Sequence, residues 1–172
     1  MANAYLAFEQ VDEEQARAIA AELERNGWTV TPSGGELRQA EKLPALVQTI
    51  GESHIVVVLA SRASHESPWL QREVAAALNN GRHIIVAHTG DLPAESWIHA
   101  TLDTSQAVDL SQGAHTEALA KIADAARTAK SGGRVIAMLN IKGGVGKTVL
   151  AANLFAAAHL ANKRSIAFID LD

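Results

Sequence analysis

The chain has 172 residues, of which 48% are hydrophobic and 20% charged, and it contains no cysteine. A chain of this length can bury a sizeable core. Without cysteine it has no disulfide framework, thiolate zinc site or cysteine nucleophile, which excludes a stapled mini-protein.

The N-terminus lacks the positive region of a signal peptide. The longest apolar stretch, Val149 to Ala161, is shorter than a membrane span of about 18 residues. We therefore expect a soluble, cytoplasmic protein.

The acidic and basic residues are unevenly distributed along the chain. Residues 1–131 hold 10 Lys and Arg against 17 Asp and Glu, a net charge of −7, whereas residues 132–172 hold 5 against 2, a net charge of +3. Because phosphate neutralisation needs clustered basic side chains, the acidic part is a poor general binder of nucleic acid. The basic segment needs an explanation of its own.

Strand and helix patterns alternate over the first 131 residues. Predicted strands cover, in order, residues 5–8, 28–31, 54–60, 83–87 and, as an edge strand, 107–110. Predicted helices cover residues 13–25, 43–50, 68–78 and 116–130. The second helix is expected to close at Gly51, and Ser67-Pro68 supplies an N-cap and a first-turn proline for the third.

The run His54 to Ala60 is β-branched and does not alternate with polar residues. This pattern is typical of a central parallel strand that is covered on both faces. Strands that alternate with helices predict an α/β fold with a flavodoxin-like, doubly wound parallel sheet, whose functional loops lie at the carboxyl ends of the strands.

After Ser131-Gly132-Gly133 the pattern starts again. A strand over 134–140, a glycine-rich loop, a helix over 147–161 and a strand over 165–171 form one βαβ unit. We therefore expect a first domain over residues 1–130, a linker over 131–133, and part of a second α/β domain over 134–172.

The loop Ile141 to Thr148 lies between a predicted strand and a predicted helix, the context that favours a phosphate site. Its glycines would let successive N–H groups point at phosphate oxygens, beside a helix N-terminus. These glycines are Gly143, Gly144 and Gly146. Lys147 would reach the β and γ phosphates, and Thr148 would bind Mg²⁺. Because Ile141 replaces the first glycine of the general P-loop pattern, the strict motif is not met.

The string Lys-Gly-Gly-x-Gly-Lys-Thr resembles the deviant Walker A motif of the ParA/MinD partition ATPases. The strand that ends at Asp172 is similar to that family's second conserved segment. The resemblance implies ATP and Mg²⁺ as ligands, with Lys142 as the signature lysine that reaches a nucleotide across a dimer interface. It also implies that Asp172 is a catalytic residue that positions the attacking water and that Asp170 lies near Mg²⁺. The alternative is a glycine turn with incidental lysines.

The βαβ unit is too short for a complete ATPase domain of that family, because it cannot contain a Walker B strand or base-binding loops. A lone unit also leaves sheet edges uncovered. We expect residues 134–172 to be the truncated start of such a domain, which is not a competent ATPase by itself.

The first 130 residues resemble a TIR domain of the bacterial form. Three segments carry the resemblance: Asn26–Val30, Ile55–Ser61 and, above all, Ser67–Val74. The last, Ser-Pro-Trp-Leu-Gln-Arg-Glu-Val, is similar to the family's Ser-x-Trp-Cys-x-x-Glu-Leu, with Leu70 in the usual place of the cysteine. The segments occur in the family's order.

In TIR domains that cleave NAD⁺ the glutamate of this helix is the catalytic carboxylate, and Glu73 is the matching position. Breaking the ribose–nicotinamide bond develops oxocarbenium character, which a carboxylate beside the ribose can stabilise. Nicotinamide leaves as a neutral molecule, so one acidic residue can suffice. Trp69 lies one turn before Glu73 on the same helix face. The alternative is that Glu73 is a solvated helix residue and Trp69 a core anchor, and for Trp69 the core role is favoured.

Other positions depart from the family pattern. Phe8-Glu9 stands where members usually have Ser-Tyr, and the loop Gly34 to Lys42 lacks the usual Pro-Gly. Phe8 could stack on a nucleotide ring and Ser61 ends the right strand, although a structural role is favoured for both. The seven histidines show no metal-ligand spacing, and Trp97 is expected to serve packing.

The leading hypothesis is a TIR-domain NAD⁺ glycohydrolase in bacterial stress or defence signalling, joined to a P-loop segment. By resemblance, self-association of the TIR domains completes the active site. The first alternative is a non-catalytic TIR adaptor that recruits partners for a ParA/MinD-like ATPase. The second is a partition-type ATPase with an N-terminal adaptor.

Overall fold

The computed structural model describes residues 2–34, 38, 42–90, 92–114 and 116–131. The chain divides into two compact units, Met1–Gly132 and Gly133–Asp172. All described residues belong to the first unit, and the predicted βαβ unit lies outside them. The domain boundaries at 130 and 134 therefore stay a prediction.

Five parallel strands form one sheet in the order β2-β1-β3-β4-β5. They are β1 (Ala2–Ala7), β2 (Trp28–Pro32), β3 (Ile55–Ala60), β4 (His83–His88) and β5 (Val108–Asp109). This order is the flavodoxin-like one and confirms the predicted doubly wound sheet. All six residues of β3 are buried, as its unbroken apolar run predicts. Strand β1 begins three residues earlier than predicted, because Ala2 already pairs with Trp28.

Helices precede or follow each strand. They are the 3-10 helix η1 (Gln10–Asp12) and the α-helices α1 (Glu13–Arg25), α2 (Leu43–Glu52), α3 (Arg62–Glu66), α4 (Pro68–Asn79), α5 (Trp97–Thr101) and α6 (Thr116–Ser131). The four long helices were predicted, whereas η1, α3 and α5 are too short to show a periodic pattern. The expected end of α2 at Gly51 is wrong. That glycine lies inside the helix, where an added Cβ would be 3.0 Å from Asn80 Oδ1.

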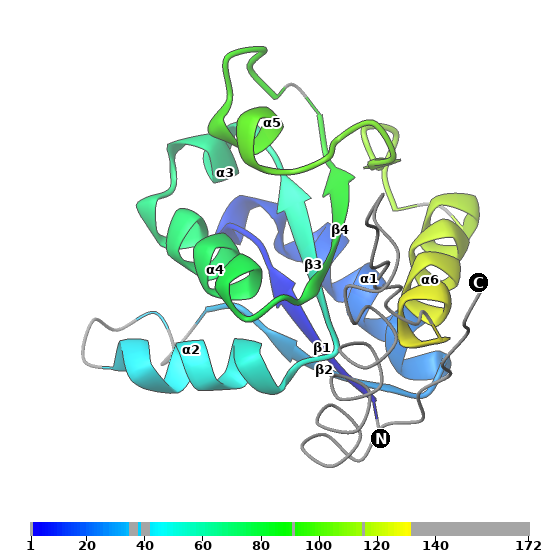
Figure 1. The fold of residues 1–172 in the computed structure, drawn as a ribbon. Coiled ribbons are helices and arrows are strands. Elements are labelled where there is room, and N and C mark those ends of the chain that lie inside the picture. The colour runs from blue at the N-terminus through cyan, green and yellow to red at the C-terminus, as the bar shows by residue number, and fades with distance from the viewer. Residues whose placement is uncertain (1, 35–37, 39–41, 91, 115, 132–172) are drawn as a thin grey trace, which may run out of the picture. The chain divides into compact units, whose positions relative to one another are not determined.

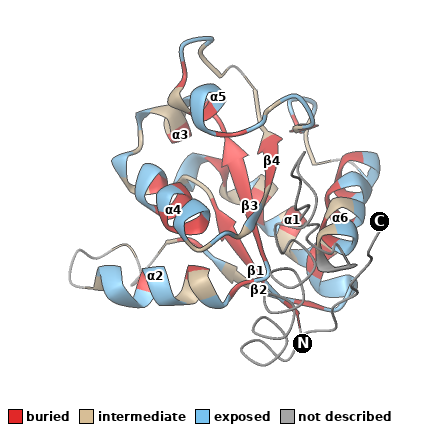
Figure 2. Cartoon of the chain, viewed as in Figure 1, coloured by how far each residue is buried: buried red, intermediate tan, exposed pale blue. Residues whose placement is uncertain are grey.

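The sheet separates two buried clusters of apolar side chains (Figures 1 and 2). Helices α1 and α6 cover one face and supply residues such as Ile19 and Ile122. Helices α2, α4 and α5 cover the other face, with residues such as Ile50 and Leu70. Side chains of β3 enter the two clusters alternately, as the period of two in a strand requires.

The sheet order places the carboxyl ends of β1 and β3 side by side, although the chain leaves them toward opposite faces. In open α/β sheets such a switch point is the usual position of a ligand crevice. Among the described residues, no helix is both long and apolar enough to cross a membrane.

Ser67 fixes the start of α4, because its side chain accepts a hydrogen bond from the N–H of Leu70 at 3.1 Å. We expect Ser67→Ala to lower the free energy of unfolding by about 1 kcal/mol. Chemical denaturation measures this change. Ser105→Ala, which removes an exposed hydroxyl bonded to Asp103, is the control and should cost less than about 0.5 kcal/mol. Equal effects of the two substitutions would contradict the capping role.

Candidate active site at Glu73

Glu73 lies on the inner face of α4 and is fully buried, with 0% of its surface exposed. It lies six residues after the cap of the helix, so Ser67 sets the turn on which it falls. The alternative of a solvated helix glutamate is therefore wrong. A carboxyl group in this position needs partners, because an unpaired buried charge is strongly unfavourable.

Two hydroxyl groups donate to one oxygen of the Glu73 carboxyl group. The Tyr5 hydroxyl is 2.9 Å from Oε1, and the Ser33 hydroxyl is 2.5 Å from the same atom. The other oxygen, Oε2, is buried and has no hydrogen-bond partner among the described residues. The nearest cationic group is Arg38, whose Nη2 lies 3.8 Å from Oε2. The two oxygens of one carboxyl group are thus in unequal surroundings.

Arg38 is held beside this carboxyl group by three donated hydrogen bonds. Its Nε donates to Ser33 Oγ at 3.1 Å, its Nη1 to Glu9 Oε2 at 2.9 Å, and its Nη2 to the Phe8 carbonyl oxygen at 2.6 Å. Its side chain is 22% exposed. We call the five residues Tyr5, Glu9, Ser33, Arg38 and Glu73 the Glu73 cluster.

The topology of the sheet explains why these side chains meet. Tyr5 points from β1 toward α4, because it belongs to the apolar cluster on that face. Glu9 follows the carboxyl end of β1, and Ser33 follows the carboxyl end of β2, where its N–H bonds the Leu6 carbonyl oxygen at 2.7 Å. Adjacent parallel strands bring these ends to one edge of the sheet, where Glu73 reaches them from α4.

Burial and the neighbouring groups act in opposite directions on Glu73. Removal from water raises the pKa of its carboxyl group, and the hydroxyl of Ser33, the positive charge of Arg38 and the Tyr5 hydroxyl oppose that rise only in part. Burial and the Glu73 carboxyl group also raise the pKa of Tyr5, which therefore stays a hydrogen-bond donor. A carboxyl group with a perturbed pKa and a specific charged neighbour is a candidate functional group.

Trp69 donates no hydrogen bond to the Glu73 cluster. It is half-buried and packs against the apolar cluster of α2 and α4, and the Arg72 guanidinium lies 5.4 Å from its ring centre. Its indole Nε1 is buried without a hydrogen-bond partner among the described residues. These surroundings fit the favoured reading of Trp69 as a core anchor.

The Ser61 hydroxyl and the Phe8 ring have partners other than the Glu73 carboxyl group. Ser61 donates to Asp12 Oδ2 at 2.7 Å and caps α3. The ring of Phe8 packs against the cluster of α1 and α6, on the other side of the sheet from Tyr5. Only its carbonyl oxygen takes part in the site, as an acceptor for Arg38.

A second polar network lies at the carboxyl edge of the sheet. Asp12 is buried, and its Oδ1 and Oδ2 accept hydrogen bonds from Thr89 at 2.9 Å and Ser61 at 2.7 Å. Ser64 continues the network, with its hydroxyl 3.2 Å from that of Ser61 and donating to the Leu59 carbonyl oxygen. Asp12 thereby links the segments that follow β1, β3 and β4.

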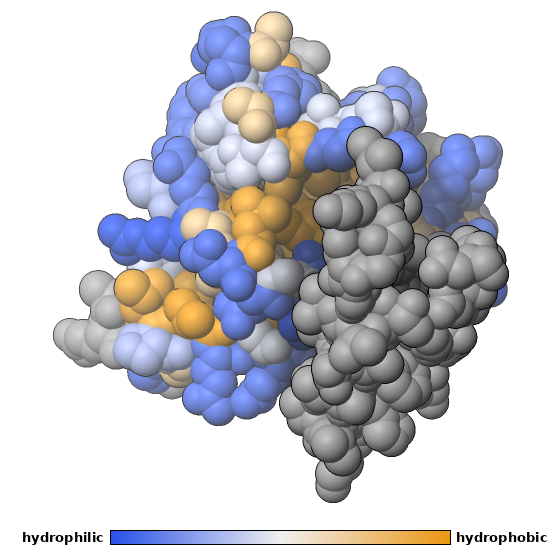
Figure 3. Space-filling model, in the orientation of Figure 1, coloured by the Kyte–Doolittle hydropathy of each residue, from blue (hydrophilic) through white to orange (hydrophobic). Residues whose placement is uncertain are grey.

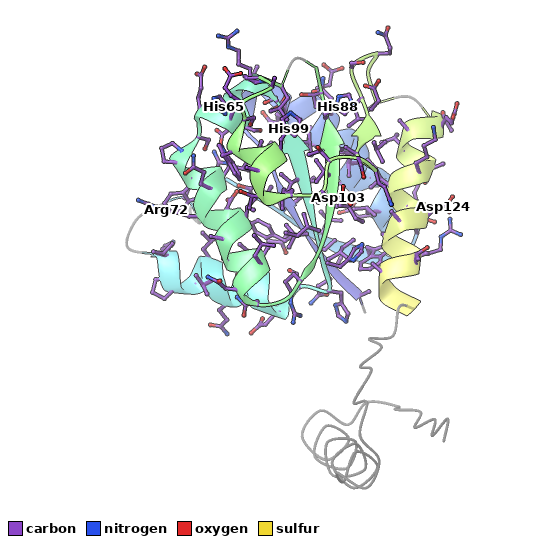
Figure 4. The ribbon with its side chains drawn as sticks, turned by 45° about the horizontal axis from the view of Figure 1, so that its top comes forward. His65, Arg72, His88, His99, Asp103 and Asp124 are labelled. Atoms are coloured by element: carbon purple, nitrogen blue, oxygen red, sulfur yellow. The ribbon has the colours of Figure 1, made fainter. Side chains whose placement is uncertain are left out.

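The histidines that lie near the carboxyl edge each have a polar neighbour (Figure 4). His65 Nδ1 is 3.1 Å from Ser96 Oγ, His99 Nδ1 is 3.0 Å from Thr104 Oγ1, and His88 faces Asp109 at 3.6 Å. The part of the chain that the structure describes contains no group of three or more potential metal ligands. Trp97 packs against the α2 and α4 cluster and donates to the His65 carbonyl oxygen, which confirms its packing role.

Apolar surface is exposed over α2 and α4 (Figure 3). The exposed residues are Leu43, Val47 and Leu78. A shallow groove between α4 and α5 is lined by Gln71, Val74, Ala75, Leu78, Trp97 and Thr101. Glu73 does not line this groove, and no side chain in it is titratable.

The predicted phosphate-binding and Mg²⁺-binding residues all belong to the segment after residue 131. Lys142, Gly143, Gly144, Gly146, Lys147, Thr148, Asp170 and Asp172 lie outside the described residues. Among the described residues, the sequence identified Glu73 as a candidate, but it did not identify Tyr5, Ser33 and Arg38 as its partners. Tyr5 carried a usable signal, because a tyrosine inside a buried strand needs a partner for its hydroxyl group.

Glu73 makes stability depend on pH with a definite sign. Its pKa in the folded state is raised above the ordinary value of 4.5. The folded state therefore binds the proton more tightly, and stability falls as pH rises through the interval between the two values. We expect the free energy of unfolding of Glu73→Gln, minus that of the wild type, to grow as pH rises above about 4.5. Denaturant unfolding at several pH values measures the difference.

The control for this experiment is Glu66→Gln, because Glu66 is exposed and pairs with Arg62 on α3. Its difference from the wild type should change little over the same pH range. A Glu73→Gln difference that is independent of pH would contradict a raised pKa in the folded state.

Asp12 should be important for stability because its carboxylate accepts from two hydroxyl groups in a buried position. We expect Asp12→Ala to lower the free energy of unfolding by about 1 to 3 kcal/mol, since Ser61 and Thr89 lose their acceptor. Asp124→Ala on α6 removes an exposed ion pair with Arg127 and should cost less than about 0.5 kcal/mol. Thermal unfolding of both variants checks the contrast, which similar losses would refute.

Known proteins were compared with the chain at the level of families and of structures. A TIR domain family model matches residues 5–123, and a model of the CobQ/CobB/MinD/ParA nucleotide binding domain matches residues 136–172. No curated protein matches the chain. The first family model covers more than half of the chain, and the second covers the segment with the predicted P-loop.

Three solved structures illustrate the likeness. A metazoan TIR-STING receptor from C. gigas, in complex with 2',3'-cGAMP, is 17% identical with a TM-score of 0.52, over 71% of this chain and 38% of the receptor. The Clostridium botulinum CMP N-glycosidase BcmB is 18% identical with a TM-score of 0.42, over 58% and 82%. The TIR domains of the activated Roq1 resistosome, which recognises the pathogen effector XopQ, are 14% identical with a TM-score of 0.45, over 91% and 99%.

The likeness to the C. gigas receptor shows the fold, and this chain spans only 38% of that receptor's length. The five-stranded parallel sheet with helices on both faces is the TIR-like α/β fold. The chain belongs to the TIR domain family, and a short CobQ/CobB/MinD/ParA nucleotide-binding segment follows its TIR domain.

Proposed function

We propose that the TIR domain is an NAD⁺ glycohydrolase and that Glu73 is its catalytic carboxylate. One observation carries the proposal: the glutamate at the family's catalytic position is a buried carboxyl group with one oxygen fixed by Tyr5 and Ser33. Its other oxygen, Oε2, has no hydrogen-bond partner among the described residues. Buried polar atoms normally find partners, so such an atom calls for an explanation.

The reaction breaks the bond between C1′ of the ribose and the nicotinamide nitrogen, whose electrons leave with neutral nicotinamide. Water then adds to C1′ and loses a proton, which gives ADP-ribose. The negative charge of Glu73 would stabilise the oxocarbenium character that develops at C1′, and Oε2 would accept a ribose hydroxyl group. The hydroxyls of Tyr5 and Ser33 would hold the carboxyl group in place while this occurs.

Substrate access requires a change at the Glu73 cluster, because Glu73 has no exposed surface and Arg38 lies beside Oε2. We propose that self-association of TIR domains supplies this change and completes the site. On this proposal an isolated domain is nearly inactive. Activity should then depend more steeply on protein concentration than a single-site enzyme allows.

The burial of Glu73 also favours a second candidate function. A carboxyl group with 0% exposure, bonded to two neighbouring segments, can serve packing alone. In that case the domain is a non-catalytic TIR adaptor that recruits partners through its surface. The two candidates make opposite predictions for nicotinamide release.

For the segment over residues 136–172 we propose binding of a nucleotide, namely ATP with Mg²⁺, as its family match suggests. Lys142, Lys147 and the loop glycines would hold the phosphates, and Thr148 and Asp170 would lie near the metal ion. Asp172 would position water only in a complete ATPase domain. We place the whole protein in the bacterial cytoplasm, in stress or defence signalling.

The enzymatic proposal is tested by incubating the full 172-residue chain with NAD⁺ at several protein concentrations. Chromatography measures the nicotinamide that is released. We expect Glu73→Ala and Glu73→Gln to lower the rate by at least about 100-fold, since the charge that faces the transition state is lost. Glu66→Ala, an exposed glutamate of an ion pair, should retain the wild-type rate.

Unfolding curves must first show that each variant is folded under the assay conditions. Equal release by the wild type and by a folded Glu73→Gln would rule out Glu73 as the catalytic carboxylate. No release at any concentration, with an intact fold, would favour the adaptor function.

A further inference from the structure

Two carboxyl groups share one guanidinium group in the Glu73 cluster. Arg38 donates to Glu9 Oε2 at 2.9 Å, and its Nη2 lies 3.8 Å from Glu73 Oε2. The first distance is that of a charge-assisted hydrogen bond, whereas the second is too long for one. Arg38 therefore bonds to Glu9 directly, whereas it acts on Glu73 through its charge and through the Ser33 hydroxyl, which accepts from Arg38 and donates to Glu73.

We propose that Arg38 is a shared counter-ion, and that Glu9 is a positioning residue which determines how much of its positive charge is available to Glu73. The catalytic part of this inference rests on the proposed NAD⁺ cleavage, but its electrostatic part does not. Neither Glu9 nor Arg38 was among the candidate site residues of the sequence. Glu9 stands at a position where this chain departs from the family's Ser-Tyr pair.

The hydrogen bonds of Arg38 orient its guanidinium group toward Phe8 and Glu9. Its Nη1 bonds the Glu9 carboxylate, its Nη2 bonds the Phe8 carbonyl oxygen, and its Nε bonds Ser33. The acceptors Phe8 and Glu9 are consecutive residues, so the segment after β1 anchors the guanidinium group from one side. The fork that could pair with both oxygens of a carboxylate is thus used for this segment.

Among the described residues, few charged or titratable groups face Glu73. Tyr5 acts on it from β1, Glu9 from the segment after β1, and Arg38 from the segment after β2. On α4 itself, Arg72 lies over the Trp69 ring. On the neighbouring helices, Glu52 of α2 is exposed and accepts from Gln48, and His99 of α5 faces Thr104. Glu9 and Arg38 are therefore the two charges whose removal isolates the effect.

The inference predicts opposite effects of two charge-neutralising substitutions. Glu9→Gln removes a negative charge and leaves the charge of Arg38 uncompensated, so the pKa of Glu73 should fall. The glutamine can still accept from Arg38, and the predicted direction is the same whether or not the guanidinium group moves. Arg38→Gln removes the only nearby positive charge among the described groups, so the pKa of Glu73 should rise.

The experiment is a pH titration of the full chain, labelled with ¹³C at the glutamate side-chain carboxyl groups. NMR monitors the chemical shifts of these groups. The resonance of Glu73 is identified by its loss in Glu73→Gln. Its midpoint should move to lower pH in Glu9→Gln and to higher pH in Arg38→Gln. The matched controls are Glu66→Gln and Arg62→Gln, which break an exposed pair on α3 and should leave the midpoint unchanged.

Nicotinamide release gives a parallel readout that a purely structural role would not move. If the carboxylate form of Glu73 is the active one, the acidic limb of the pH profile of kcat/KM should move to lower pH in Glu9→Gln. In Arg38→Gln it should move to higher pH. If the wild type releases no nicotinamide, the proposed function fails, whereas the NMR titration still decides whether Arg38 is shared.

Midpoints that do not move, or that move in the same direction in both variants, would overturn the inference. Should Arg38→Gln not fold, the direction of the shift in Glu9→Gln decides the matter. Arg38→Lys then replaces it as the second variant, because it keeps the charge but loses the fork. A midpoint that falls in Glu9→Gln but not in the double variant Glu9→Gln/Arg38→Lys would show that the guanidinium geometry is required.

Discussion

The buried carboxyl group of Glu73 ties together three segments of this TIR domain. Glu73 can remain without exposure only because Tyr5 and Ser33 donate to it and Arg38 supplies a positive charge. The three partners come from different segments, so the carboxyl group holds α4, β1 and the end of β2 in a fixed relation. Removal of one partner would leave a desolvated group uncompensated, which is costly. A buried carboxyl group of this kind can serve a chemical function, or it can specify how the surrounding elements pack.

The position of the Glu73 cluster follows from the sheet order. Parallel strands present their carboxyl ends at one edge, and the order β2-β1-β3 places Ser33, Glu9 and the segment after β3 next to each other there. The Asp12 network occupies the same edge and ties together the segments after β1, β3 and β4. The atoms of the Asp12 network have partners, whereas the Glu73 cluster keeps two oxygens, Glu9 Oε1 and Glu73 Oε2, without a donor among the described residues. The contrast separates a structural network from a candidate catalytic one.

The sequence was a good guide to the sheet and to the long helices, because their apolar periodicity and caps are local signals. It also identified Glu73 through a motif on one helix. The burial of Glu73 and its partners could not be predicted in the same way, since Tyr5, Ser33 and Arg38 meet it only through tertiary contacts. The predicted end of α2 at Gly51 was wrong for a similar reason, because the surroundings of Gly51 are set by a tertiary contact. That glycine lies inside the helix, where an added Cβ would be in tight contact with Asn80 Oδ1, and does not end it.

The alternation of side chains along β3 has a mechanical consequence. Helix α6, through which the chain continues into the nucleotide-binding segment, packs on the face of the sheet opposite to α4 and Glu73. A displacement that enters the domain along α6 has to cross the sheet before it reaches the carboxyl group. Strands β1, β3 and β4 all place side chains alternately in the two clusters, as Val57 and Val58 of β3 do, so these strands together lie between α6 and the carboxyl group. Because close-packed interiors transmit strain, such a displacement would reach Glu73 through these strands, of which β1 carries its partner Tyr5.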